Sequence, residues 1–201
     1  MVAQPSQPHS MTVDEWRELE EGSHDVKHEY IDSQVYAMAG GSLAHSRVSI
    51  NVLKALDAVL GRGPCRAYNS DAAAQLSPTR YTYPDASVTC DERDRPTTKV
   101  REIKAPRVIA EVLSDSTEAY DRGEKFGYYR ECSTVQEYVL VSTKRQLVEV
   151  FRRTQEGWTA YHVYGSGDEI ELTSLDMHLS LAALYELTDV PEIVEARKGE
   201  V

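Results

Sequence analysis

Three residues of this chain, Asp85, Glu111 and Lys125, are of the types that carry out metal-assisted hydrolysis of a phosphodiester. Glu111 lies in the apolar run 108–113, and a strand that apolar is normally buried on both faces. An unpaired ionised carboxylate there costs several kcal/mol or stays protonated, so a metal ion or another cation must compensate it. Two acids on neighbouring strands and one lysine form the minimum set of groups for this reaction.

Period-two alternation decides whether the two acids can meet. In the predicted strand 83–90, Asp85 shares one face with every second residue, and Glu111 does the same in the predicted strand 107–113. If these strands pair, the two carboxylates converge at one site. The charged segment 91–105 is then the loop that joins them.

Carboxylate oxygens are ligands that Mg²⁺ and Mn²⁺ prefer. We therefore expect Asp85 and Glu111 to hold Mg²⁺ or Mn²⁺, with the backbone carbonyl of Val112 as a further oxygen ligand. The metal would polarise the scissile phosphate and lower the pKa of a bound water. Lys125 would stabilise the developing charge or orient the attacking water.

Each of these residues also has a structural interpretation. Asp85 follows a proline and could belong to a turn. Glu111 could form a salt bridge with Arg107 or with another base, and Lys125 could pair with Asp121, four residues earlier on a helix. The three candidates together favour chemistry more than any one of them does alone.

The elements that must position these residues are predicted to form one mixed α/β (α+β) domain around a central sheet. A capping box at Thr12 and Glu15 predicts the first helix. Apolar periodicity predicts helices over residues 12–21, 42–60, 115–131 and 181–186, a hairpin over 26–39, and strands over 65–68, 72–76, 83–90, 107–113, 136–142, 147–153 and 158–164.

Length and composition are those of one globular domain, with 201 residues, 41% of them hydrophobic and 27% charged. Residues 1–10 are predicted to be a disordered tail, residues 11–190 the domain, and residues 191–201 a C-terminal tail. No apolar stretch approaches the ~20 residues that cross a bilayer, so no membrane partner is expected. The net charge of −11 counts against a nucleic-acid enzyme, which usually carries a basic surface.

The three cysteines, Cys65, Cys90 and Cys132, form no Cys-x-x-Cys pair. Their odd number argues against a disulfide framework. A reducing cytoplasm is therefore the expected location.

Several short motifs resemble one known family. They are Tyr83-Pro84-Asp85, Ala105-Pro106 before Val108-Ile109-Ala110-Glu111-Val112-Leu113-Ser114, Asp121-Arg122-Gly123-Glu124-Lys125 with Tyr129, and His28-Glu29-Tyr30-Ile31-Asp32. Together they resemble the Uma-two family, a bacterial group of restriction-endonuclease-like proteins in the PD-(D/E)XK nuclease superfamily. The resemblance extends over residues 13–187.

The resemblance implies a restriction-endonuclease-like fold, in which helices flank a central mixed β-sheet, and a divalent-metal site. By position, Asp85 and Glu111 match the metal ligands, and Glu29 matches an early acid of the family that would complete the site. Leu113 stands where the superfamily lysine is usual, and Lys125 matches the helix lysine that replaces it in this family. Three positions depart from the family pattern, in a turn and in packing: Ser33, Val139 and Ser142.

The predicted function is that of a metal-dependent endonuclease, with nucleic acid as its substrate, DNA as the expected polymer and a homodimer as the expected assembly. A non-catalytic binding or assembly domain on the same fold is the alternative, because fold does not determine function. The acidic charge favours that alternative. A hydrolase of a small phosphorylated substrate is a third hypothesis. His45, at a predicted helix start near the acidic hairpin, is interpreted as a capping or core-edge residue, with a contact to substrate as the alternative.

Overall fold

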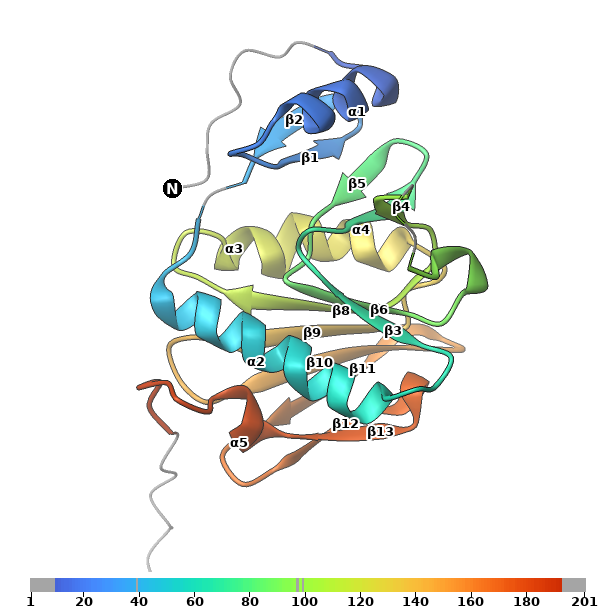
Figure 1. Ribbon diagram of the computed structural model, residues 1–201. Helices are drawn as coiled ribbons and strands as arrows, with labels where there is room; N and C mark the ends of the chain where they lie inside the picture. The colour runs from blue at the N-terminus through green and yellow to red at the C-terminus, as the bar shows by residue number, and fades with distance from the viewer. Residues whose placement is uncertain (1–9, 39, 97, 99, 193–201) are drawn as a thin grey trace, which may run out of the picture.

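A six-stranded sheet is built around the apolar strand β8 (Pro106–Leu113), as Figure 1 shows. The computed structural model describes residues 10–38, 40–96, 98 and 100–192. β8 pairs in parallel with β9, and the other neighbours in this sheet are antiparallel. The order is β11-β10-β9-β8-β6-β3, with β3 (Arg66–Asn69), β6 (Ala86–Thr89), β9 (Glu137–Ser142), β10 (Val148–Thr154) and β11 (Gly157–Tyr164). The predicted mixed sheet is confirmed.

Helices cover both faces of this sheet (Figure 1). On one face, α2 (Leu43–Leu60) packs on β8 and on a C-terminal hairpin. This hairpin consists of β12 (Glu169–Leu172), η3 (Thr173–Leu175) and β13 (Met177–Ser180), and the chain then continues into α5 (Leu181–Leu184). On the other face, Tyr129 packs with Ile109 and Leu113 of β8. Because both faces of β8 are covered, a carboxylate in it must have a partner. The β12–β13 hairpin was not predicted, and α5 is two residues shorter than the predicted helix.

The helical segment that carries Lys125 departs from the prediction. It consists of α3 (Glu118–Tyr120), the π-helical turn η2 (Asp121–Lys125) and α4 (Phe126–Glu131). The predicted start at residue 115 or 116 is wrong, because the hydroxyl of Ser114 accepts a hydrogen bond from the Thr117 N–H and holds the chain in a turn. The π-helical turn buries both of its end residues, Asp121 and Lys125, which places them on the site side.

A second, five-stranded sheet has the order β2-β1-β5-β4-β7. Its strands are β1 (His28–Ile31), β2 (Gln34–Ala37), β4 (Ala73–Ser77), β5 (Arg80–Thr82) and β7 (Glu102–Ile103). Helix α1 (Val13–Gly22) packs Trp16 against Tyr30 and Tyr81, and the capping box at its start is confirmed. The predicted hairpin is also confirmed, but residues 91–105 are not only a loop, since they include η1 (Glu92–Asp94) and β7.

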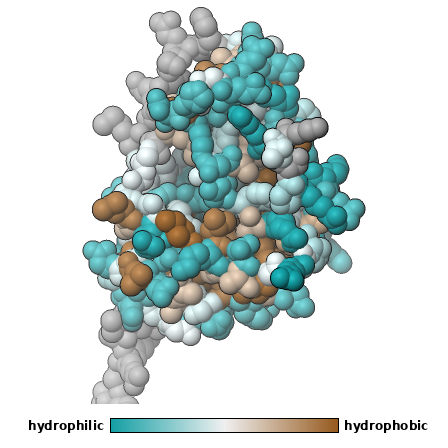
Figure 2. Space-filling view, viewed as in Figure 1, coloured by the Kyte–Doolittle hydropathy of each residue, from teal (hydrophilic) through white to brown (hydrophobic). Residues whose placement is uncertain are grey.

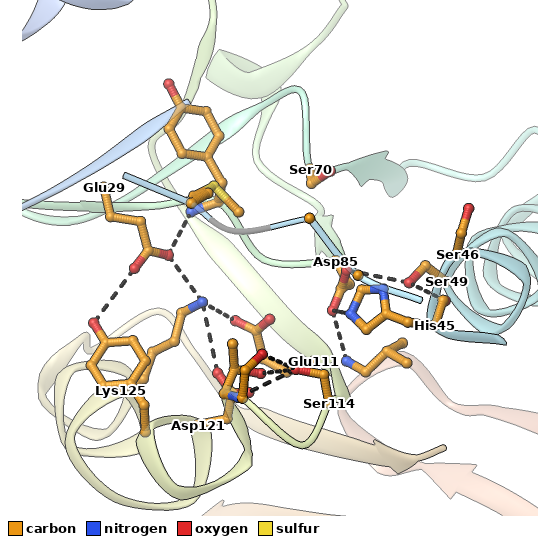
Figure 3. A pocket seen from close by; sticks show the side chains of 18 of the residues that line it. Glu29, His45, Ser46, Ser49, Ser70, Asp85, Glu111, Ser114, Asp121 and Lys125 are labelled. Carbon is orange, nitrogen blue, oxygen red and sulfur yellow. Dashed lines mark hydrogen bonds and ion pairs between the residues drawn. The ribbon is translucent and has the colours of Figure 1, made fainter. Parts of the chain in front are cut away.

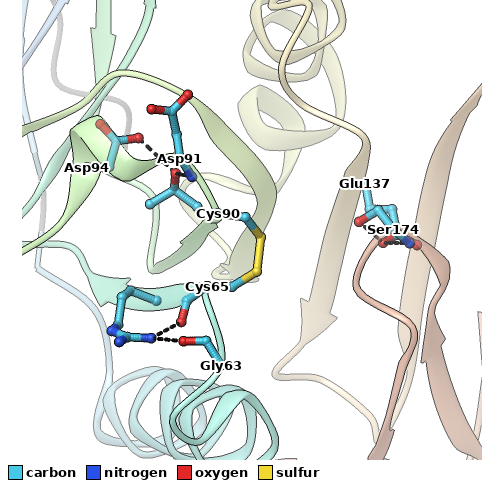
Figure 4. The surroundings of a disulfide bond; sticks show 9 residues. Gly63, Cys65, Cys90, Asp91, Asp94, Glu137 and Ser174 are labelled. Carbon is cyan, nitrogen blue, oxygen red and sulfur yellow. Dashed lines mark hydrogen bonds between the residues drawn. A yellow bond between two sulfur atoms is a disulfide. The ribbon is translucent and has the colours of Figure 1, made fainter.

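A disulfide joins Cys65 and Cys90, which corrects the expectation that the cysteines are unpaired (Figure 4). The register of β3 with β6 pairs Arg66 with Thr89, so the two cysteines are the next residues along adjacent strands. Counting cysteines could not reveal this register. Cys132 is buried and free. With this disulfide, the cysteines no longer support the expected reducing cytoplasm.

Apolar side chains gather on the surface of α2, where Leu43, Ile50 and Val59 are exposed (Figure 2). The same helix buries Val48 and Leu56 in the core, so it is apolar on more than one side. Within the described residues, no helix is both long enough and apolar enough to cross a membrane.

The predicted tails, residues 1–10 and 191–201, lie outside the described residues except for Ser10, Pro191 and Glu192. The tails and the domain bounds 11–190 therefore stay predictions.

Candidate active site

Asp85 and Glu111 come together because β6 and β8 pair as predicted. The antiparallel register joins Ala86 to Ala110, and its continuation by one residue places Asp85 opposite Glu111. Both residues line one cavity of about 520 Å³. This cavity lies between the start of α2 and the segment that contains η2, and Figure 3 shows the side chains that face it.

Glu111 is compensated by a lysine. Its Oε1 lies 2.9 Å from Lys125 Nζ and accepts a 2.6 Å hydrogen bond from the Tyr129 hydroxyl. Burial raises the pKa of Glu111 above its ordinary value; Lys125 opposes that rise and favours the ionised form, whereas the nearby Asp121 and Asp85 carboxylates add to it. The structural alternative, a salt bridge of Glu111 with Arg107 or another base, is met by Lys125 and not by Arg107.

Lys125 bridges two acids. Its Nζ lies 2.9 Å from Oε1 of Glu29 as well as 2.9 Å from Oε1 of Glu111, whereas Oδ1 of Asp121 is 4.0 Å away. Burial lowers the pKa of Lys125, but the charges of Glu111, Glu29 and Asp121 outweigh it and raise the pKa well above its ordinary value. The helical pair with Asp121 is thus the weakest of the three contacts. Lys125 is held as an ammonium ion at the bottom of the cavity.

Glu29 reaches the site from the other sheet. It lies on β1, and its carboxylate accepts hydrogen bonds from the Tyr83 N–H at 3.2 Å and from the Tyr120 hydroxyl at 3.4 Å. The resemblance implies that Glu29 completes the site, and the structure places Glu29 next to Lys125. The exposed fractions of Glu29, Glu111 and Lys125 are only 4–5%.

Asp85 stands on the opposite side of the cavity from Lys125 (Figure 3). Its Oδ2 accepts a 2.8 Å hydrogen bond from the Val112 N–H and lies 3.4 Å from His45 Nε2. Its Oδ1 accepts a 3.2 Å hydrogen bond from the Ser49 hydroxyl. Asp85 thus contacts a backbone N–H and two side chains of α2 at the cavity, so its contacts are not those of a turn alone.

Sequence reasoning did not assign three residues to this site: His45, Ser49 and Asp121. The hydrogen bond to Asp85 raises the pKa of His45 more than burial lowers it. Burial raises the pKa of Asp121, although Lys125 opposes this. The signal that could have found His45 and Ser49 was their i,i+4 spacing, which places both on one side of α2. His45 lines the cavity beside Asp85, a position that fits the alternative of a substrate contact better than the capping or core-edge interpretation.

The donors in the cavity suit a hard cation, since Asp85 and Glu111 present carboxylates and each carboxylate has about four lone-pair sites. Within the described residues, no group of three or more His, Cys, Asp and Glu side chains is placed to hold a metal ion. A metal held by Asp85 and Glu111 would have these two carboxylates as its side-chain ligands. Oxygen from the backbone or from water would complete its coordination.

The fold and the site define an α+β protein in which a mixed sheet flanked by helices carries an acid–acid–lysine set in a cavity. Comparison with known proteins identifies its family. A model of the Uma2 family, described as "Putative restriction endonuclease", matches residues 13–183. The chain belongs to this family, and the resemblance to the Uma-two motifs is confirmed.

Relatives cover most of the chain. The "Uncharacterized protein slr1290" of Synechocystis sp. is 39% identical over 183 residues, which are 90% of this chain and 95% of the relative. The "Uncharacterized protein sll1609" of the same organism is 29% identical over 165 residues, or 81% of this chain and 93% of the relative. A crystal structure described as that of "a putative nuclease belonging to DUF820 from Anabaena variabilis" has a TM-score of 0.70 at 19% identity, and the match covers 87% of this chain and 97% of that one. This likeness confirms the predicted fold.

Proposed function

We propose that this protein is a metal-dependent endonuclease that hydrolyses phosphodiester bonds of nucleic acid in the cavity around Asp85 and Glu111. The observation that carries the proposal is the convergence of these two carboxylates with the Lys125 ammonium in one cavity. The descriptions of the family and of the Anabaena protein support the same reaction class. DNA is the polymer we expect, and the homodimer stays a prediction.

In this proposal, Asp85, Glu111 and the carbonyl of Val112 hold Mg²⁺ or Mn²⁺. When bound, the metal supplies polarisation of the phosphate and a water of lowered pKa. Lys125 stabilises the negative charge that develops on the phosphate oxygens. Glu29, 2.9 Å from Nζ, holds the ammonium of Lys125 in position for this role.

The test is a cleavage assay on double-stranded DNA, single-stranded DNA and RNA, with Mg²⁺, with Mn²⁺ and with a chelator. Wild type is compared with Asp85→Asn, Glu111→Gln and Lys125→Met. Glu149→Gln is the matched control, because Glu149 is a buried carboxylate on β10 that does not line the cavity. Metal-dependent cleavage that only the three site variants lose supports the proposal. Cleavage that persists in them refutes the assignment of the site.

A non-catalytic binding domain is the second candidate, and one observation favours it. Lys125 already compensates Glu29 and Glu111, and within the described chain no three-ligand metal cluster is formed in advance. Calorimetric titration with Mg²⁺ and Mn²⁺ separates the two candidates. Metal binding that Asp85→Asn and Glu111→Gln abolish favours the endonuclease, whereas a chain that binds no metal and cuts no substrate favours the binding domain.

A further inference from the structure

The depth of the candidate site limits what can enter it. Glu111 is 4% exposed and lines a cavity of about 520 Å³. Cavities of ~300–1,000 Å³ enclose small organic molecules, so one nucleotide unit fits the range. The phosphates of a duplex lie along a stiff rod with a persistence length of ~150 base pairs, so they do not enter a cavity of this size. We therefore expect a phosphodiester that reaches Glu111 to belong to an unpaired strand, which bends more easily into a cavity of this size.

The charges around the cavity, which are mainly negative, also disfavour binding of a duplex backbone. Its lining contains the carboxylates of Glu29, Asp85, Glu111, Asp121 and Glu124. Among the described residues that line it, Lys125 is the only lysine or arginine, and two acids already engage that lysine. Proteins that bind through phosphate contacts use many such cations and release counterions. Affinity for a strand in this cavity must come from another interaction.

Tyrosines supply that interaction, and four of them line the cavity: Tyr36, Tyr83, Tyr120 and Tyr128. Three of these have a cation within 4.8–5.9 Å of the ring centroid, namely Lys27 at Tyr83, Arg80 at Tyr128 and Lys125 at Tyr120. Among the described residues, no lysine or arginine lies over the ring of Tyr36, unlike the other three rings. Aromatic faces bind unpaired bases of any sequence by stacking.

Tyr36 is placed beside the reacting groups. It lies on β2 directly across from Glu29 on β1, so the two side chains share one face of the hairpin. That face borders the cavity, because both residues line it. Tyr36 is half-buried, and its register partner Glu29 is the residue that pairs with Lys125.

We propose that the cavity takes single-stranded nucleic acid and that Tyr36 stacks on a base next to the scissile phosphate. The identity of the cavity as the cleavage site rests on the proposed function, but the binding of the strand does not require cleavage. Stacking rather than phosphate contact makes the affinity insensitive to salt. Because Lys125 is the only lysine or arginine among the described residues that line the cavity, at most one phosphate is neutralised, and the slope of log K against log[salt] is no steeper than about −0.7.

The experiment measures fluorescence anisotropy of labelled twelve-nucleotide single strands of DNA and of RNA, and of the matching DNA duplex. Each is titrated with the full chain in a chelator and again in Ca²⁺. We expect the single strands to bind at least ten-fold more tightly than the duplex. Tyr36→Leu, which keeps apolar bulk but no flat ring, should lose about ten-fold of the single-strand affinity, whereas Tyr36→Phe should keep it. Tyr161→Leu is the control, because Tyr161 lies on β11 and does not line the cavity.

A duplex that binds as tightly as the single strands overturns the inference, as does a Tyr36→Leu variant that binds like wild type. A steep salt slope, which indicates many phosphate contacts, also overturns it. None of these three results would contradict metal-dependent cleavage by wild type, so they would not refute the proposed function. Conversely, tyrosine-dependent binding of single strands without any cleavage would sustain the inference while the endonuclease proposal fails.

Discussion

The backbone N–H of Val112 donates a 2.8 Å hydrogen bond to Oδ2 of Asp85. Asp85 is therefore oriented by the strand next to its own, and the residue that orients it is the one whose carbonyl we propose as a metal ligand. The pairing of β6 with β8 thus sets the direction of the carboxylate toward the cavity. A shift of this register would remove Asp85 from the site, because the side-chain period of a strand is two.

Gly41 should control the position of His45. A Cβ on Gly41 would lie 2.6 Å from Nδ1 of the His45 ring, whereas a Cβ on Gly40 would meet nothing within 4 Å. We expect Gly41→Ala to push the ring away from Asp85 and to lower kcat/KM for cleavage by about ten-fold, the scale of a small misplacement in an active site. Gly40→Ala is the matched control and should stay within two-fold of wild type. Equal activities of the two variants would contradict the role given to His45.

Lys125→Met should destabilise the metal-free protein by about 3–5 kcal/mol, since it leaves the buried carboxylates of Glu29 and Glu111 without their cation. Urea denaturation at pH 7 measures the change. Lys144→Met is the control, because Lys144 pairs with Asp115 and Glu118 on the surface and its loss should leave the free energy of unfolding nearly unchanged. Adding Glu29→Gln to Lys125→Met should recover part of the loss. A double variant less stable than Lys125→Met would argue against this coupling.

The Cys65–Cys90 disulfide closes a loop with a sequence separation of 25 residues. Chain-entropy arguments give about 3 kcal/mol of stability for a loop of this length. We expect a reducing agent to lower the urea midpoint of wild type but not that of Cys65→Ser. Cys132→Ala is the control that should keep the response, since Cys132 is free. If reduction leaves the midpoint of wild type unchanged, the disulfide contributes nothing to stability in solution.

Acid should weaken the contact between α1 and β7. Burial raises the pKa of Glu102, but hydrogen bonds from Arg17 and Lys104 outweigh this and hold it below the ordinary value of 4.5. A depressed folded-state pKa gives stability that is present above 4.5 and is lost as the pH falls through the lower folded value. Wild type should therefore be more stable than Glu102→Gln at pH 7, and the difference should shrink below pH 4.5. Denaturation series at several pH values measure this, and a constant difference would contradict it.

Much of the site could be predicted because it depends on short-range pattern. Alternation along two strands was enough to bring Asp85 and Glu111 together, and the apolar run around Glu111 required a compensating cation. That cation is Lys125. The place of Glu29 came only from the resemblance, because its contact with Lys125 joins residues far apart in the chain.

The remainder depends on three-dimensional relationships that no single segment contains. The contact of His45 with Asp85 requires the packing of α2 on the central sheet. The Cys65–Cys90 disulfide requires the register of β3 with β6. The π-helical turn at Asp121–Lys125 is a distortion that helix propensity does not encode, since propensity describes only regular hydrogen bonding.

The two acids that hold Lys125 belong to different sheets, Glu29 to the five-stranded sheet and Glu111 to the six-stranded one. A chain in which only one sheet has formed therefore has no complete site. Local opening of the β1–β2 hairpin would separate Glu29 from the lysine while the central core stays intact. The proposed activity would then report on the docking of the two sheets and would disappear on any opening that parts them, even where the central core remains folded.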